Sequence, residues 1–130
     1  MITKKRVFIS FDFDHDEDTK ILLAEQAKLP DSPFNVTDVS VREHLIDDWE
    51  AKVRHRMDNI DMVIVLCGEH AFLAKGMATE LTIAQEQNKP YFLLAAYANR
   101  TCTKPTSAMS SDKVYERTWD NLKTLIGGWR

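Results

Sequence analysis

The sequence predicts one α/β domain, a flavodoxin-like three-layer sandwich in which helices cover both faces of a central parallel sheet. Three apolar runs, at residues 7–11, 62–67 and 91–96, are continuous rather than alternating, which is typical of strands buried on both faces. A weaker run at residues 34–39 follows a turn signal at residues 30–33. Helical patterns separate these runs, so we expect four to five parallel strands, the first four in the order 2-1-3-4.

Length and charge exclude several classes of protein. The 130 residues suit a single domain, residues 1–130, and the net charge of −3 with no basic stripe argues against a nucleic-acid partner. No apolar stretch approaches the ~18 residues of a membrane span, and the apolar run behind the basic N-terminus is too short for a signal peptide. We therefore expect a cytoplasmic protein with no membrane partner. Neither Cys67 and Cys102 nor the four histidines have metal-ligand spacing, so no metal site is predicted.

The predicted helices follow from capping signals and apolar stripes. The first begins near Asp16 or Asp18 and ends before Pro30. The third covers residues 76–88, and a closing helix at the C-terminal end stops at Gly127 and Gly128. The second helix has the clearest stripe, and its basic residues Lys52, Arg54 and Arg56 are interpreted as a solvated face. The stripe consists of Ile46, Trp49, Val53, Met57 and Ile60.

A polar segment at residues 99–113 has no periodicity and contains Pro105. A loop of this length in a small domain is typical of a functional lid or of a poorly ordered segment. The fifth strand that is usual in such folds is either absent or hidden in this loop.

Glu80 is the first candidate for chemistry. Its neighbours three and four residues away on the predicted helix are apolar or small, so no ion pair within the helix explains it. A carboxylate in such surroundings is partly desolvated, which favours its neutral form and suits acid–base or nucleophilic work. The alternative is a glutamate that points to solvent from the edge of the apolar stripe, and the pattern alone leaves both open.

An acidic loop follows the first strand, where open α/β sheets bind ligands. Asp12, Asp14 and Asp16 could ligate Mg²⁺ or orient ribose hydroxyls. The alternative is a helix N-terminus rich in acids, which explains Asp16 and Asp18 through capping and the helix dipole. It explains Asp12 and Asp14 less well, because they lie at the strand end. The loop at residues 68–72 faces this acidic loop in the expected strand order and leads to Glu80.

Several segments resemble TIR domains, and most closely the TIR-like proteins of bacterial Thoeris antiphage systems. Residues 6–11 resemble the first box of TIR domains, and residues 38–40 resemble the start of their BB loop. Residues 61–66, together with Glu80 and Leu81, resemble their third strand and the helix that carries the catalytic glutamate. The ending at residues 118–128 is similar to that subfamily. The resemblance implies a TIR-like variant of the predicted sandwich.

The resemblance implies cleavage of the bond between nicotinamide and ribose in NAD⁺, which is then a substrate, with no cofactor required. It assigns the catalytic carboxylate to Glu80. It further implies an ADP-ribose-derived signalling nucleotide that activates a separate effector protein, and self-association through TIR–TIR contacts. The implied substrate-binding residues are Ser10, Phe11, Asp12, Asp14, Asp38, Ser40, Gly68 and Met77.

One departure from the family pattern concerns the pocket wall. TIR enzymes commonly carry Trp four residues before the glutamate, often with Cys next to it, whereas this chain has Gly76 and Met77 there. An aromatic wall of the pocket is therefore absent from this helix.

Two other functions remain open, and a third is disfavoured. A TIR-like scaffold could oligomerise without chemistry, and a nucleoside deoxyribosyltransferase-like enzyme would share the sheet and the glycosidic bond. A phosphoacceptor receiver domain is disfavoured, because it needs an aspartate at the end of the third strand, where this chain has Cys67 and Gly68.

Overall fold

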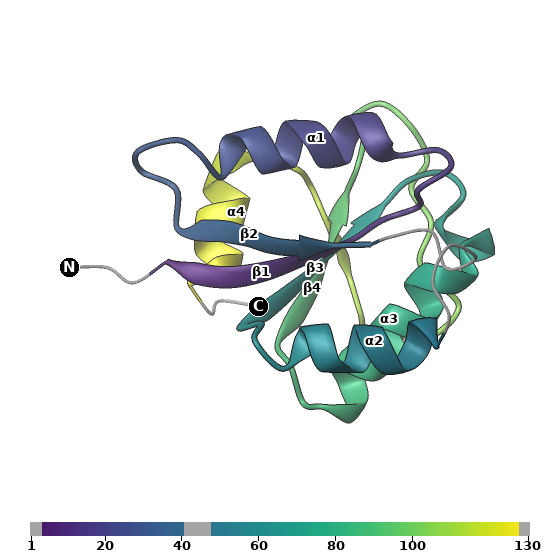
Figure 1. The fold of residues 1–130 in the computed structure, drawn as a ribbon. Coiled ribbons are helices and arrows are strands. Elements are labelled where there is room, and N and C mark those ends of the chain that lie inside the picture. Colours follow the sequence, from purple (N-terminus) through teal and green to yellow (C-terminus); the bar gives the residue numbers. More distant parts are fainter. Residues whose placement is uncertain (1–3, 41–47, 128–130) are drawn as a thin grey trace.

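The computed structural model describes residues 4–40 and 48–127 of the chain. Five parallel strands form one sheet in the order β2-β1-β3-β4-β5 (Figure 1). This confirms the predicted fold class and the order of the first four strands. The strands are β1 (Lys5–Ser10), β2 (Phe34–Val39), β3 (Met62–Cys67), β4 (Tyr91–Ala95) and β5 (Val114–Tyr115).

Helices cover both faces of the sheet, as Figure 1 shows. Helices α1 (Glu17–Gln26) and α4 (Trp119–Ile126) lie on one face, and α2 (Trp49–Met57) and α3 (Lys75–Glu86) lie on the other. This division follows from the strand order, because the chain moves in one direction from β1 to β2 and in the opposite direction from β2 through β3 to β4. Right-handed crossovers then place the helices on opposite faces.

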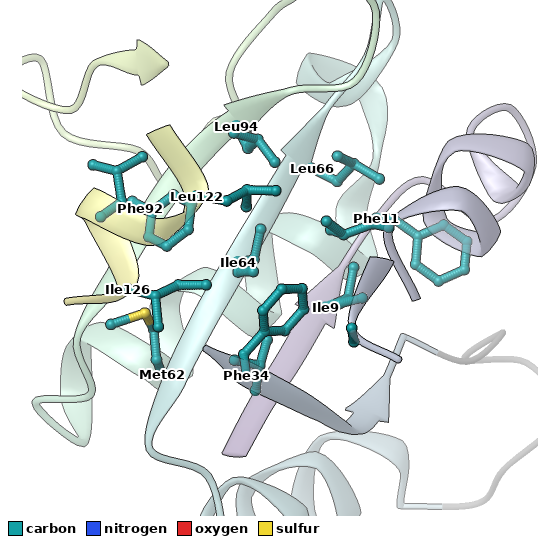
Figure 2. Packing of buried hydrophobic residues seen from close by; sticks show 14 of the residues in the cluster. Ile9, Phe11, Phe34, Met62, Ile64, Leu66, Phe92, Leu94, Leu122 and Ile126 are labelled. Carbon is teal, nitrogen blue, oxygen red and sulfur yellow. The ribbon is translucent and has the colours of Figure 1, made fainter. Parts of the chain in front are cut away.

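Two apolar clusters fill the spaces between the sheet and its helices. Side chains alternate along each strand, so Val7 and Ile9 of β1 join the cluster under α1 and α4, whereas Phe8 joins the cluster under α2 and α3. Figure 2 shows the first cluster, in which Phe34 and Leu122 pack against the central strands. All six residues of β3 are buried, which explains why its sequence is continuously apolar.

The fifth strand lies just after the polar segment at residues 99–113. It has only two residues, Val114 and Tyr115, which pair with β4, so it carries no period that a sequence pattern can reveal. The polar segment itself is held to the body of the protein: Ser107 donates a hydrogen bond to the Ala78 carbonyl oxygen (2.7 Å), and Tyr91 donates one to Asp112 (2.8 Å). These contacts make the segment an ordered part of the fold.

Helix α2 carries most of the apolar stripe that the sequence predicts. Trp49, Val53 and Met57 are buried on it, and Ile60 is buried beyond its end. Ile46 lies outside the described residues. Among the described residues, no helix is long and apolar enough to cross a membrane.

Neighbouring leucines on α1 offer a matched test of this packing. Leu23 is fully buried under the helix, whereas Leu22 is 60% exposed. We expect Leu23→Ala to lower the free energy of unfolding by about 2–5 kcal/mol, because it leaves a cavity. Leu22→Ala should change it by less than about 0.5 kcal/mol. Urea denaturation of both variants measures the difference, and equal effects would contradict this placement of α1.

Candidate functional site

The candidate site lies at the carboxyl ends of β1 and β3, where the strand order reverses and where open α/β sheets bind ligands. Here the Glu80 side chain of α3 points inward and is only 1% exposed. Its Oε1 accepts hydrogen bonds from the Ser10 hydroxyl (2.7 Å) and the Ser40 hydroxyl (2.5 Å). The carboxyl ends of β1 and β2 are thus joined to α3 through one carboxylate oxygen.

Alternation along β1 decides which of its residues meets Glu80. Ser10 lies two residues after Phe8 and therefore points to the same face of the sheet, the one that α3 covers. Phe11 points to the opposite face, where its ring stacks on Phe13 with centroids 5.6 Å apart. Phe11 contributes its backbone to the site, because its N–H donates to the Ser40 hydroxyl oxygen (3.1 Å).

A bulge in β2 brings Ser40 level with Ser10. Val36 pairs with Val7, but Asp38 pairs with Phe8, so Thr37 is an extra residue in the ladder. Such bulges re-aim the side chains that follow them. Beyond the Val39–Ile9 pair, the Ser40 N–H donates to the Ile9 carbonyl oxygen (2.9 Å) and its hydroxyl reaches Glu80.

Burial dominates the electrostatics of Glu80. Desolvation raises the pKa of its carboxyl to about 7, against the opposing effects of the Ser40 and Ser10 hydroxyls and of Arg56. The second oxygen, Oε2, is buried and has no hydrogen-bond partner among the described residues. A carboxyl group with a pKa near neutrality and one unpartnered oxygen is suited to gain or lose its proton when a charged ligand arrives.

Arg56 corrects the interpretation of α2 as carrying only a solvated basic face. Its guanidinium pairs with the Asp38 carboxylate through two nitrogens and also donates to the Val39 carbonyl oxygen (3.2 Å). Arg56 therefore holds the end of β2 just before Ser40. Asp38 is occupied by this ion pair in the described structure.

A second cluster of polar side chains is centred on Asp12. Its Oδ2 lies 2.6 Å from Nδ1 of His15, and its Oδ1 accepts the N–H of Asp14 (3.1 Å). The Asp12 side chain is 9% exposed, whereas the His15 side chain is 48% exposed. The His15 ring stacks on the ring of His70, with centroids 4.1 Å apart. Asp12 and His70 thus fix the orientation of an imidazole that faces solvent.

Asp16 corrects a second interpretation, because its side chain makes no capping hydrogen bond to α1. The side chain is buried, and its Oδ1 accepts a hydrogen bond from the Tyr97 hydroxyl (3.0 Å). Its Oδ2 is buried without a partner among the described residues, and desolvation raises its pKa. The carboxylate fills the space beside Gly68, where a Cβ would lie 2.2 Å from Oδ2. This close approach explains a glycine directly after β3.

Met77 and Gly76 lie in the first part of α3. Met77 is 1% exposed and belongs to the core cluster under α2 and α3. A Cβ on Gly76 would lie 3.8 Å from the indole of Trp49, so an aromatic ring from α2 packs against α3 at this point. The space beside Gly76 is thus filled by an aromatic ring from the neighbouring helix.

The structure therefore brings together Ser10, Ser40 and Glu80 directly and places Asp12, Asp14 and Gly68 at the same edge of the sheet. Sequence reasoning placed Asp16 and the loop at residues 68–72, which contains His70, at this edge, but it missed His15, Tyr97 and Arg56. The one local signal was the spacing of Asp12 and His15, which allows contact within a turn. Among the described residues, no group of three or more His, Cys, Asp or Glu side chains could hold a metal ion.

Comparison with known proteins identifies the family. Residues 8–101, more than half of the chain, match the family described as Thoeris protein ThsB, TIR-like domain. The chain belongs to this family. A solved structure of a prokaryotic SEFIR domain shares the fold, with a TM-score of 0.55 and 17% sequence identity over 97% of this chain and 90% of that chain. No curated protein matches the chain in sequence.

The titration of Glu80 predicts how stability depends on pH. The pKa of Glu80 is about 7 in the folded chain, against a usual 4.5. The folded state binds the Glu80 proton more tightly than the unfolded state does. The protonated carboxyl therefore contributes its full stabilisation below pH 4.5, the pKa in the unfolded chain, and this contribution is lost as the pH rises to about 7, the pKa in the folded chain. Each pKa unit corresponds to about 1.4 kcal/mol, so stability relative to Glu80→Gln should fall by about 3 kcal/mol between about pH 4.5 and pH 7. Urea denaturation of both proteins measures this difference, and a constant difference would contradict the buried placement.

The contact between Gly68 and Asp16 predicts coupled mutational effects. Gly68→Ala should destabilise the protein by about 1–3 kcal/mol, because the new methyl group overlaps the Asp16 carboxylate. In an Asp16→Ala background the same change should cost less, since the obstructing oxygens are gone. A double-mutant cycle by thermal or urea denaturation measures the coupling, and additive effects would show that Asp16 does not occupy this space.

Proposed function

We propose that this TIR-like chain of the Thoeris family is an enzyme that cleaves NAD⁺ between nicotinamide and ribose. The observation that supports the proposal is the state of Glu80: one carboxylate oxygen is held by two serine hydroxyls, and the other is buried without a partner. The carboxylate lies at the switch point of the sheet, where ligands bind in this class of fold.

The reaction places its charge where such a carboxylate is useful. When the bond between C1 of the ribose and the nicotinamide nitrogen breaks, the electron pair leaves with nicotinamide, and positive charge develops on the ribose. An ionised Glu80 stabilises that charge or orients the ribose diol through its second oxygen. The nicotinamide ring of NAD⁺ is itself cationic, so its arrival favours the ionised form of a carboxyl group whose pKa is about 7.

Glu80 has to become accessible for this role. Only 1% of its surface is exposed, so the substrate must displace side chains that cover it. The serine hydroxyls keep the carboxylate in place while this happens, because they reach it from two different strands. Closure around the substrate would also exclude water and strengthen the electrostatic interaction.

The remaining predicted residues are proposed to surround the two ribose groups and the nicotinamide. Asp12 and Asp14 follow β1, and Gly68 follows β3 on the other side of the switch point. Asp38 lies near the end of β2 and Ser40 directly follows this strand, while Met77 belongs to the core cluster and precedes Glu80 by three residues on α3. The product is an ADP-ribose-derived nucleotide that activates a separate effector protein in antiphage defence in the cytoplasm.

Self-association is part of this proposal, and a non-catalytic interaction module is the alternative. Large apolar side chains are exposed on α1, at Ile21 and Leu22, and on the 3₁₀ helix η2 (Ala71–Leu73), at Phe72 and Leu73. Such side chains favour contact with another protein surface. The alternative needs no reaction at Glu80.

Glu80→Gln tests the proposal against this alternative. The substitution keeps the size of the side chain and removes its negative charge, so we expect nicotinamide release from NAD⁺ to fall at least about 100-fold. Glu86→Gln is the matched control, because Glu86 lies on the same helix in a half-exposed ion pair with Arg54. Chromatography of released nicotinamide measures both.

Two results would count against the enzyme. Equal rates for the wild type and Glu80→Gln would remove Glu80 from the reaction. If the wild type releases no nicotinamide, even when the effector protein of the same defence system is present, the result would favour the interaction module.

A further inference from the structure

The side chains of Asp12 and His15 have the arrangement of a general base and a carboxylate that orients it. Oδ2 of Asp12 lies 2.6 Å from Nδ1 of His15, and the Asp12 side chain is nearly buried while that of His15 is about half exposed. One face of the imidazole is covered by the ring of His70. The other ring nitrogen of His15, Nε2, has no hydrogen-bond partner among the described residues.

The backbone fixes this pair as well as the side chains do. The carbonyl oxygen of Asp12 accepts the N–H groups of His15 (3.3 Å) and Asp16 (2.8 Å), so the chain turns sharply after β1. The turn leads into α1, whose buried neighbour Asp16 is held by the Tyr97 hydroxyl. Asp12, Asp16 and His70 are titratable groups near His15, and the contacts with Asp12 and His70 orient its imidazole.

The pair follows the end of β1 that carries Ser10. Ser10 donates to the Glu80 carboxylate, and Asp12 follows two residues later in the chain. Since two peptide units span at most about 7 Å, the Cα atoms of Ser10 and Asp12 are no farther apart than that. A dinucleotide bound with its ribose C1 at Glu80 therefore lies at the strand end that also leads to Asp12 and His15.

We propose that His15 is the general base that removes the proton from the hydroxyl group accepting the ADP-ribosyl unit, and that Asp12 is its positioning residue. The inference rests on the proposed NAD⁺ cleavage and adds the residue that activates the accepting hydroxyl group. That hydroxyl comes from water or from a ribose of the same nucleotide. The buried carboxylate holds the imidazole in the tautomer whose Nε2 carries the free electron pair.

The bond between ribose C1 and the nicotinamide nitrogen breaks, and its electron pair leaves with neutral nicotinamide. The acceptor oxygen forms a bond to C1, and its proton passes to Nε2 of His15, which later releases it to solvent. Asp12 compensates the positive charge that His15 carries in between. No oxidant or reductant takes part.

The test compares acceptors that do and do not carry a proton. A pyridine base, 3-acetylpyridine, can replace nicotinamide by attack of its ring nitrogen, and this exchange needs no base. For His15→Gln we expect transfer of the ADP-ribosyl unit to hydroxyl acceptors to fall by about 100-fold. The exchange of nicotinamide for 3-acetylpyridine should stay within about twofold of the wild type. His55→Gln is the matched control, since His55 lies on α2 near Asp58 in an exposed pair (3.8 Å).

Asp12→Asn tests the positioning role separately. The amide oxygen can still accept the Asp14 N–H, which preserves the turn, but the amide NH2 group cannot accept a hydrogen bond from Nδ1 of His15. We expect hydroxyl transfer to fall more steeply than exchange, because loss of the contact with the substrate affects both reactions and loss of the contact with His15 affects only hydroxyl transfer. A merely structural role of Asp12 would reduce both reactions together.

Mass spectrometry of the products shows whether the accepting hydroxyl comes from water or from a ribose of the same nucleotide. Transfer to water gives a product that is heavier than the cyclised product by one water molecule.

The outcomes distinguish the two proposals. If neither reaction occurs in the wild type, NAD⁺ cleavage fails and this inference with it. If Glu80→Gln loses both reactions while His15→Gln loses only hydroxyl transfer, both proposals are supported. If His15→Gln loses both reactions equally, or neither, the role of His15 is overturned and NAD⁺ cleavage stands.

Discussion

The burial of the Glu80 carboxylate is the constraint on which the rest of the site depends. A buried carboxylate is costly unless hydrogen bonds compensate it. Two hydroxyls from different strands, Ser10 and Ser40, meet one of its oxygens, so the ends of β1 and β2 and the middle of α3 must keep a fixed arrangement. Arg56 secures the same arrangement from α2, because it holds Asp38 and the Val39 carbonyl oxygen.

Much of the fold could be predicted because the buried strands are continuously apolar. The predicted runs at residues 34–39 and 62–67 coincide with β2 and β3, and the helix predicted at residues 76–88 differs from α3 by a residue or two at each end. The fifth strand could not be located, since two paired residues carry no periodic signal. Its place after the polar segment is decided by tertiary contacts of that segment.

The sequence identified several residues of the candidate site, but not how their side chains are arranged. The lack of a basic neighbour drew attention to Glu80, the strand end drew attention to Asp12, and the family resemblance drew attention to Ser10. A sequence does not show which face of the sheet each residue of a strand meets, so Phe11 was grouped with residues from which its side chain points away. Asp16 was attributed to capping, because acids are common at helix starts whether they cap or are buried.

The extra residue at Thr37 has a consequence for how relatives of this chain should be aligned. Only the number of residues between the start of β2 and its terminal serine decides whether that hydroxyl faces α3 or the other helical layer. A homologue with the same serine but one residue fewer would present a different side chain to the glutamate. Inheritance of this site is therefore better followed through strand length and phase than through the identity of any one residue.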